Sequence, residues 1–141
     1  MATAGYSGTP LPKKLGIKEG STVALLGAPG DFAGLGDLPS GTTLRTAARG
    51  RSDVIVSFHT RRADLEKRLD TLLRALDVDG GLWVAWPKKS AGVDTDITED
   101  VVREVALPIG LVDNKVCAVD DTWSGLRLVW RKEFRAHLRS G

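Results

Sequence analysis

The sequence lacks the features of a disulfide-bonded or membrane-spanning protein. Its 141 residues include a single cysteine, Cys117, so no internal disulfide can form, which suits a reducing compartment. No apolar run approaches the roughly 20 residues that a membrane-spanning helix needs. Residues 1–8 contain no basic segment followed by an apolar core, so we expect no signal peptide. These absences predict a cytoplasmic protein.

The sequence also lacks an excess of charge of one sign. It has 20 Lys and Arg residues against 18 Asp and Glu residues, a formal net charge of +2. A nucleic-acid-binding domain shows a strongly basic, clustered charge, so this balance argues against nucleic acid as a partner. No set of Cys, His and carboxylate residues has the spacing of metal ligands, and we expect no metal site. With 42% hydrophobic residues, the chain can bury the core of one domain over residues 1–141, with an irregular arm at 1–12 and a frayed basic tail at 132–141.

A strand, a helix and a second strand occupy the centre of the chain. Residues 53–58 are apolar and β-branched, as in a strand that is buried on both faces. Thr60 then offers an N-cap hydroxyl, and leucines recur at helical spacing through residues 65–76. Residues 79–81 predict a turn, and residues 82–86 a second buried strand that Pro87 ends. Together they predict a βαβ unit in a parallel sheet.

The flanking segments extend this sheet. Residues 22–26 predict a buried strand and residues 42–46 a weaker edge strand, with no amphipathic helix between them, so the first crossover helix is expected to be shortened or absent. Residues 96–99 have the spacing of a capping box before a helix that Pro108 and Gly110 end. Strands at 115–119 and 126–130 are too close together for a crossover and predict an antiparallel hairpin. The fold class is therefore α/β: an open, mostly parallel Rossmann-like sheet of about six strands in the order 2-1-3-4-6-5, with a C-terminal antiparallel hairpin.

Parallel strands followed by a terminal antiparallel hairpin resemble the carboxyl-terminal half of the class I methyltransferase sheet. Residues 18–27 are similar to the approach to the first strand and glycine loop of that fold, and residues 79–84 to its turn and fifth strand. More closely, the sequence resembles a widespread bacterial family known as a domain of unknown function. That resemblance rests on residues 5–8, 14–18, 83–89, 98–104, 110–120 and 123–126. His59 stands where an aliphatic residue is expected in that family, and the resemblance implies no activity.

A methyl donor or a dinucleotide requires features that are incomplete here. Binding calls for a Gly-x-Gly-x-x-Gly run after the first strand and an acidic residue after the second. Residues 27–30 instead contain Pro29, which offers no N–H to a phosphate, and no strong helix follows. Asp31 or Asp37 could replace the acidic residue, but a plain strand-to-loop turn is favoured. We therefore predict no cofactor.

Ligands of open α/β sheets bind beyond the carboxyl ends of the strands. That edge should collect several basic and polar residues and hold an anionic small molecule with a phosphate or carboxylate group. The alternative is a solvated basic rim. The candidate ligand-binding residues are Gly27, Pro29, Asp31, His59, Arg61, Arg62, Trp86, Lys88 and Lys89.

Three further side chains have open roles. His59 could act as a general base, although the sequence shows no Ser/His/Asp spacing to support it, and we assign no catalytic residue. Cys117 lies in an apolar run and is expected to be a buried, inert thiol. Trp123 lies in the expected hairpin connection, either exposed as an interface anchor or folded back onto the sheet edge.

The favoured interpretation is a small non-enzymatic module that binds an anionic small molecule or a protein partner in a regulatory role. It rests on the missing fingerprints of a methyl donor and a dinucleotide. The alternative is an enzyme with a degenerate methyltransferase-like fold that acts on a nucleotide or acyl substrate. The sequence leaves the oligomeric state of the protein open.

Overall fold

The leucine-striped helix and the strands on either side of it form the centre of the fold, as predicted. The structure is a computed structural model that describes residues 9–32 and 34–140. β3 (Ser52–Phe58) leads into α2 (Arg62–Ala75), which leads into β4 (Leu76–Pro87). β3 and β4 are parallel neighbours. Leucines spaced by three or four residues lie on one side of an α-helix, and this side of α2 is buried at Leu65, Leu69 and Leu72.

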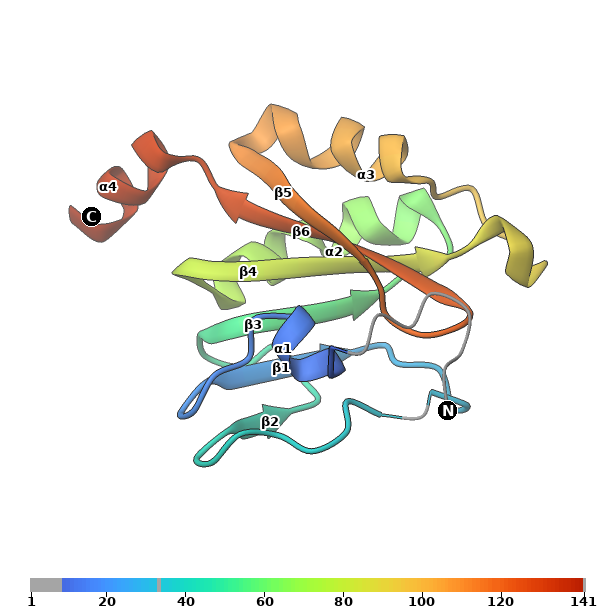
Figure 1. The fold of residues 1–141 in the computed structure, drawn as a ribbon. Helices are drawn as coiled ribbons and strands as arrows, with labels where there is room; N and C mark the ends of the chain where they lie inside the picture. The colour runs from blue at the N-terminus through green and yellow to red at the C-terminus, as the bar shows by residue number, and fades with distance from the viewer. Residues whose placement is uncertain (1–8, 33, 141) are drawn as a thin grey trace.

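The other strands complete a six-stranded sheet in the predicted order, β2-β1-β3-β4-β6-β5 (Figure 1). β1 (Thr22–Leu26) lies between β3 and the short edge strand β2 (Thr43–Arg45), parallel to both. β6 (Trp123–Trp130) runs antiparallel to β4 and to the outer strand β5 (Leu111–Ala118). Both the strand order and the antiparallel hairpin are thus confirmed.

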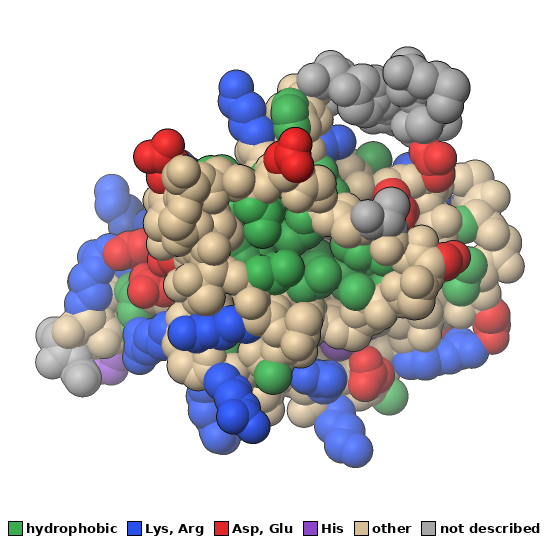
Figure 2. All heavy atoms as spheres, turned by 90° about the horizontal axis from the view of Figure 1, so that it is seen from below, with side chains coloured by type: hydrophobic (Ala, Val, Ile, Leu, Met, Phe, Trp, Pro, Cys, Tyr) green, Lys and Arg blue, Asp and Glu red, His purple; other side chains and the backbone are tan. Residues whose placement is uncertain are grey.

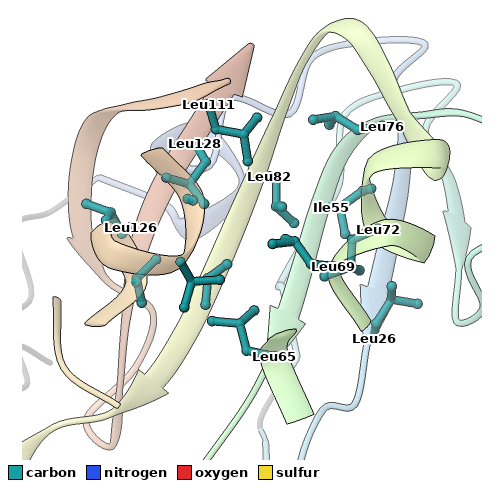
Figure 3. Packing of buried hydrophobic residues seen from close by; sticks show 14 of the residues in the cluster. Leu26, Ile55, Leu65, Leu69, Leu72, Leu76, Leu82, Leu111, Leu126 and Leu128 are labelled. Carbon is teal, nitrogen blue, oxygen red and sulfur yellow. The ribbon is translucent and has the colours of Figure 1, made fainter. Parts of the chain in front are cut away.

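Different elements cover the two faces of the sheet. α2 and α3 (Glu99–Ala106) cover one face, where leucines of α2 point toward Ile55 and Leu82 of the sheet (Figure 3). The opposite face packs against the segment around α1 (Leu11–Lys14) and the β1–β2 connection. On that face the Trp83 indole Nε1 donates a hydrogen bond to the Leu15 carbonyl, 3.0 Å away. This bond ties the N-terminal segment to the middle of the sheet.

The β1–β2 connection, residues 27–42, contains no helix among its described residues, which exclude Ala33. This matches the expectation of a shortened or absent first crossover helix. Figure 2 views the molecule from the β2 side and shows a hydrophobic area at the centre of that face, ringed by charged side chains. Leu44 of β2 is 47% exposed, and Leu25, Phe32 and Leu38 are half-buried against the neighbouring core. The missing crossover helix leaves apolar side chains near β2 partly open to solvent.

Two predictions about the central unit are wrong. Residues 79–81 are not a turn, because β4 begins at Leu76 and runs through them with a register shift against β3. Thr60 is not the N-cap of α2. Arg61 holds that position without a side-chain cap bond, and the Arg62 N–H donates to Asp96 Oδ1 at 2.7 Å. A carboxylate from a distant loop therefore caps the helix, and local sequence could not indicate it.

Three predictions about the C-terminal part also need correction. The cap of α3 is Thr98, whose side chain accepts from the Val101 N–H, rather than Asp96. The hairpin connection is residues 119–122, shorter than the predicted 120–125. The tail is not frayed but forms α4 (Lys132–Ser140), with the Phe134 ring centroid 6.4 Å from that of Trp130 and Arg139 paired with Asp79. The helix forms because it has apolar and ionic contacts with the sheet.

Short 3-10 turns complete the connections. One, η1 (Lys89–Ala91), follows β4, and the other, η2 (Leu107–Ile109), follows α3 and contains Pro108. Gly110 then has φ +105°, the left-handed conformation expected of a glycine that ends a helix. No helix of the described chain combines the length and apolarity that a membrane crossing requires.

Candidate functional site

The carboxyl ends of β1, β3 and β4 lie at one edge of the sheet because the three strands are parallel neighbours. We call this the carboxyl edge. Gly27, Pro29 and Asp31 follow β1 there, with Asp31 exposed. Lys88 and Lys89 follow β4, the first half-buried and the second exposed. The structure thus brings the sequence-predicted segments together, although some of their side chains are not available to a ligand.

The two arginines of the carboxyl edge are engaged with carboxylates. Arg61 pairs with Asp94, and Arg62 contacts Glu104 at 2.8 Å and Glu66 at 3.4 Å. Hydrogen bonds to these carboxylates raise the pKa of both guanidinium groups. An anion at this edge would compete with those carboxylates, which weakens the case for a strongly basic site here.

A row of aromatic rings fills the sheet surface at this edge. The ring centroid of Phe32, from the β1–β2 connection, lies 5.1 Å from the ring centroid of Phe58 at the end of β3. The centroids of the Phe58 and Trp123 rings are also 5.1 Å apart, in an edge-to-face arrangement. Phe58 and Trp123 are 6% and 8% exposed. The protein's own rings therefore occupy space beside the glycine turn that follows β1.

Trp123 is consequently not an exposed interface anchor. It begins β6, pairs with Pro87 and packs on Phe58, so the alternative in which it folds back onto the sheet is what the structure shows. Trp86 is likewise buried, at 6% exposure, in the core between the sheet and α2 and α3. Cys117 is half-buried, and desolvation raises the pKa of its thiol. Neither tryptophan offers a free ring to a ligand.

Sequence reasoning missed a hydrogen-bonded chain of Ser57, His59 and Asp64. The Ser57 Oγ lies 2.6 Å from His59 Nε2, and His59 Nδ1 lies 2.6 Å from Asp64 Oδ2. A carboxylate oxygen can only accept, so Nδ1 carries the proton and Nε2 of the neutral ring accepts the Ser57 hydroxyl proton. The order serine, histidine, carboxylate is that of a nucleophile, its general base and the group that orients the base.

The burial of Ser57 and His59 decides what this hydrogen-bonded arrangement can do. Ser57 and His59 are 1% and 3% exposed, so a substrate carbonyl has no access to the serine oxygen. Burial lowers the pKa of His59 more than its hydrogen bond to Asp64 raises it, which keeps the ring neutral near pH 7. The hydrogen bonds of Ser57, His59 and Asp64 therefore join the end of β3 to the first turn of α2 and do not form a nucleophilic site. His59 is a buried structural residue here and not an accessible general base.

One signal in the sequence could have found this chain. Residues two apart on a strand face the same side, so Ser57 and His59 point together toward the following helix. Asp64 lies in the first turn of that helix. The separations of two and five residues within this arrangement are far shorter than those of known triads, so triad spacing does not indicate it.

Comparison with known proteins reveals similarity in structure alone. Protein-family models and curated proteins give no match to this sequence. Among solved structures, a SAM-dependent methyltransferase from Aquifex aeolicus aligns with a TM-score of 0.55 and 17% identity, over 82% of this chain and 85% of that one. Magnesium protoporphyrin IX methyltransferase from Synechocystis PCC 6803, with bound SAM, aligns with a TM-score of 0.55 and 13% identity, over 80% and 71%. The fold is methyltransferase-like.

A third solved structure supports the same conclusion. The fibrillarin pre-rRNA processing protein of Methanococcus jannaschii aligns with a TM-score of 0.53 and 13% identity, over 86% of this chain and 69% of that one. Identities this low establish shared architecture and nothing about ligands or reactions. The closer resemblance to a family of domains of unknown function stays a prediction.

The residues of this methyltransferase-like fold do not fit the methyl donor that the architecture implies. Gly27 has φ +68°, and a Cβ there would lie 3.2 Å from the Phe58 carbonyl oxygen, so the turn presses against β3. Pro29 follows within this turn, and Phe32 then covers Phe58. No carboxylate is among residues 46–48, which follow β2 and would face the ribose. In the described part of the chain, no group of three or more His, Cys, Asp or Glu residues could hold a metal ion.

Proposed function

We propose that this chain is a binding module that has kept a methyltransferase-like sheet and does not transfer methyl groups. In this proposal it binds an anionic small molecule in a regulatory role. The observation that carries the proposal is the row of Phe32, Phe58 and Trp123 rings beside the glycine turn. In this fold class the space beyond the carboxyl ends of the strands normally receives the ligand.

Opening that space would be costly. A ligand that entered beside Gly27 would have to displace Phe32 from Phe58 and expose apolar ring surface. Full burial of a Phe side chain stabilises a fold by about 1.5–3 kcal/mol, and the half-buried Phe32 contributes only part of that. The contact between two rings adds about 0.5–1.5 kcal/mol. A methyl donor would also find no carboxylate after β2 to bind its ribose hydroxyls.

A thermal-shift screen tests the proposal across ligand classes. S-adenosylmethionine, adenosine nucleotides, acyl-coenzyme A and inorganic phosphate are each added to the protein at matched ionic strength. A ligand that binds only the folded state raises the melting temperature by mass action. We expect a rise with a phosphate-bearing compound and none with S-adenosylmethionine. The reverse pattern would overturn the proposal in favour of a protein that still binds the methyl donor.

A protein partner is the second candidate, and the hydrophobic area on the β2 side favours it (Figure 2). Leu44 is 47% exposed on β2, an edge strand with no paired strand on its outer side among residues 9–32 and 34–140. A second copy of this chain is the partner that can be tested directly. Light scattering of the wild type should then show a dimer that Leu44→Ser removes, whereas a wild-type monomer would exclude self-association at this edge.

A further inference from the structure

A second candidate site lies at the opposite edge of the sheet from the carboxyl edge. A pocket of about 450 Å³ opens where β3 and β4 begin, beside α1. Its lining includes Lys14, Lys18, Asp53, Gly80, Lys115 and Arg127, and we call it the amino-end pocket. This volume lies within the range of about 300–1,000 Å³ that small-molecule sites occupy.

Arg127 is the unusual group in the amino-end pocket. It lies in the middle of β6, between Leu126 and Leu128, whose side chains are buried on the other face of the sheet. Its side chain is half-buried, and desolvation lowers the pKa of its guanidinium group. Its one hydrogen bond to a described side chain runs from Nη1 to Asn114 Oδ1 at 3.3 Å, and no described carboxylate lies within 4.0 Å of it.

Gly81 explains how the guanidinium group reaches this position. A Cβ added to Gly81 would lie 2.4 Å from Arg127 Nε and 2.9 Å from both Cζ and Nη2. The guanidinium therefore lies across the bare backbone of β4, in space that any larger residue would occupy. Gly81, in the segment that the sequence predicts as a turn, therefore makes room for this arginine.

The other charges of the pocket leave it a net cationic character. Its lining has four cationic side chains against three carboxylates, and one of these, Asp79, is paired with Arg139. Asp53 accepts from the Thr22 N–H at 2.8 Å and Asp77 from the Asp79 N–H at 3.1 Å. Lys14 donates to the Ala118 carbonyl at 3.1 Å. Among described residues, neither Lys18 nor Lys115 forms an ion pair with a carboxylate. Burial of a charged group without a partner is costly, so an anion would find a favourable position here.

We infer that the amino-end pocket binds the oxyanion of a small molecule, a phosphate or a carboxylate group, with Arg127 as its main contact. A guanidinium group presents parallel N–H donors that match two oxygens of either anion. Lys14, Lys18 and Lys115 would supply further positive charge around it. This inference deepens the proposed function, because it moves the anion site from the carboxyl edge to the amino ends of β3 and β4.

Calorimetric titration with inorganic phosphate and, separately, with malonate tests this assignment on the full chain at constant ionic strength. Arg127→Gln removes the charge, and we expect it to weaken binding about tenfold or more, as loss of a charge-assisted hydrogen bond does. Gly81→Ala keeps the charge but displaces the guanidinium, and it should weaken binding similarly. The two anions tell a phosphate site from a carboxylate site, and preferential binding of either supports the inference.

Two control variants separate this site from alternatives. Gly30→Ala adds a methyl group where no heavy atom of the described residues beyond its chain neighbours lies within 4 Å, so it should bind like the wild type. Lys88→Ala/Lys89→Ala should also bind like the wild type, because both lysines lie at the carboxyl edge. Equal affinity of wild type and Arg127→Gln, or no binding of either anion to the wild type, would overturn the inference. Loss of binding in the double lysine variant alone would return the anion to the carboxyl edge and leave the proposed function standing.

Discussion

Ser57→Ala tests the buried hydrogen-bonded chain that joins β3 to α2. The substitution removes the hydroxyl that lies 2.6 Å from His59 Nε2, at a position 1% exposed. The imidazole nitrogen then keeps its lone pair without a donor, because His59 is 3% exposed and water cannot replace the serine. A buried polar atom left without a partner costs about 1–3 kcal/mol.

The loss should be visible in equilibrium unfolding. We expect Ser57→Ala to lower the free energy of unfolding by about 1–3 kcal/mol, which corresponds to a melting temperature lower by roughly 3–10 °C for a chain of this size. Urea denaturation followed by tryptophan fluorescence measures it. Ser90→Ala is the matched control, because Ser90 is exposed and its loss should change stability by less than about 0.5 kcal/mol. A Ser57→Ala protein as stable as the control would refute the role assigned to this chain.

Three further perturbations have defined outcomes. Burial lowers the pKa of His59 below 6.5 in the folded protein, so as pH falls His59 takes up its proton in the unfolded chain before it does so in the folded protein. The stability that neutral His59 gives the folded protein is therefore present above pH 6.5 and is lost as pH falls toward the folded pKa. Denaturation between about pH 7.5 and 5.5 should therefore show a steeper loss for the wild type than for His59→Gln, and parallel curves would contradict this. Asp96→Ala removes the cap of α2 and should cost about 0.5–2 kcal/mol, whereas the exposed Asp94→Ala should change little; equal effects would exclude the cap. Leu72→Ala empties a fully buried position and should cost about 2–5 kcal/mol, more than Leu44→Ala at 47% exposure, and thermal unfolding ranks the two.

The sheet could be predicted from the sequence because the patterns that indicate its strands are local and strong. Apolar runs in residues 53–58 and 82–86 and the leucine spacing of α2 identified the βαβ unit. The hairpin followed from the short separation between the last two strands. Errors arose where a local pattern had a tertiary explanation. Gly80 and Gly81 are typical turn residues, yet a Cβ at Gly80 would lie 2.6 Å from the Asp53 carbonyl oxygen, and Gly81 makes room for Arg127.

The candidate sites depended more on side-chain positions that the sequence does not encode locally. Arg61 and Arg62 looked like free cations, and their carboxylate partners lie as far as 42 residues away in the chain. Trp123 was misplaced because the hairpin connection is shorter than predicted. Arg127 carried one usable signal, which is a single charge within an otherwise apolar strand at 126–130.

Isothermal titration of S-adenosylmethionine into the wild-type protein measures whether this fold binds a methyl donor. We infer that the methyltransferase-like sheet does not accept a methyl donor, because Phe32 packs on Phe58 beside the glycine turn and no carboxylate is among residues 46–48 after β2. We expect no measurable heat of binding at ligand concentrations up to about 1 mM. Saturable binding in the low-micromolar range would contradict it and would require that the aromatic row open to admit the ligand.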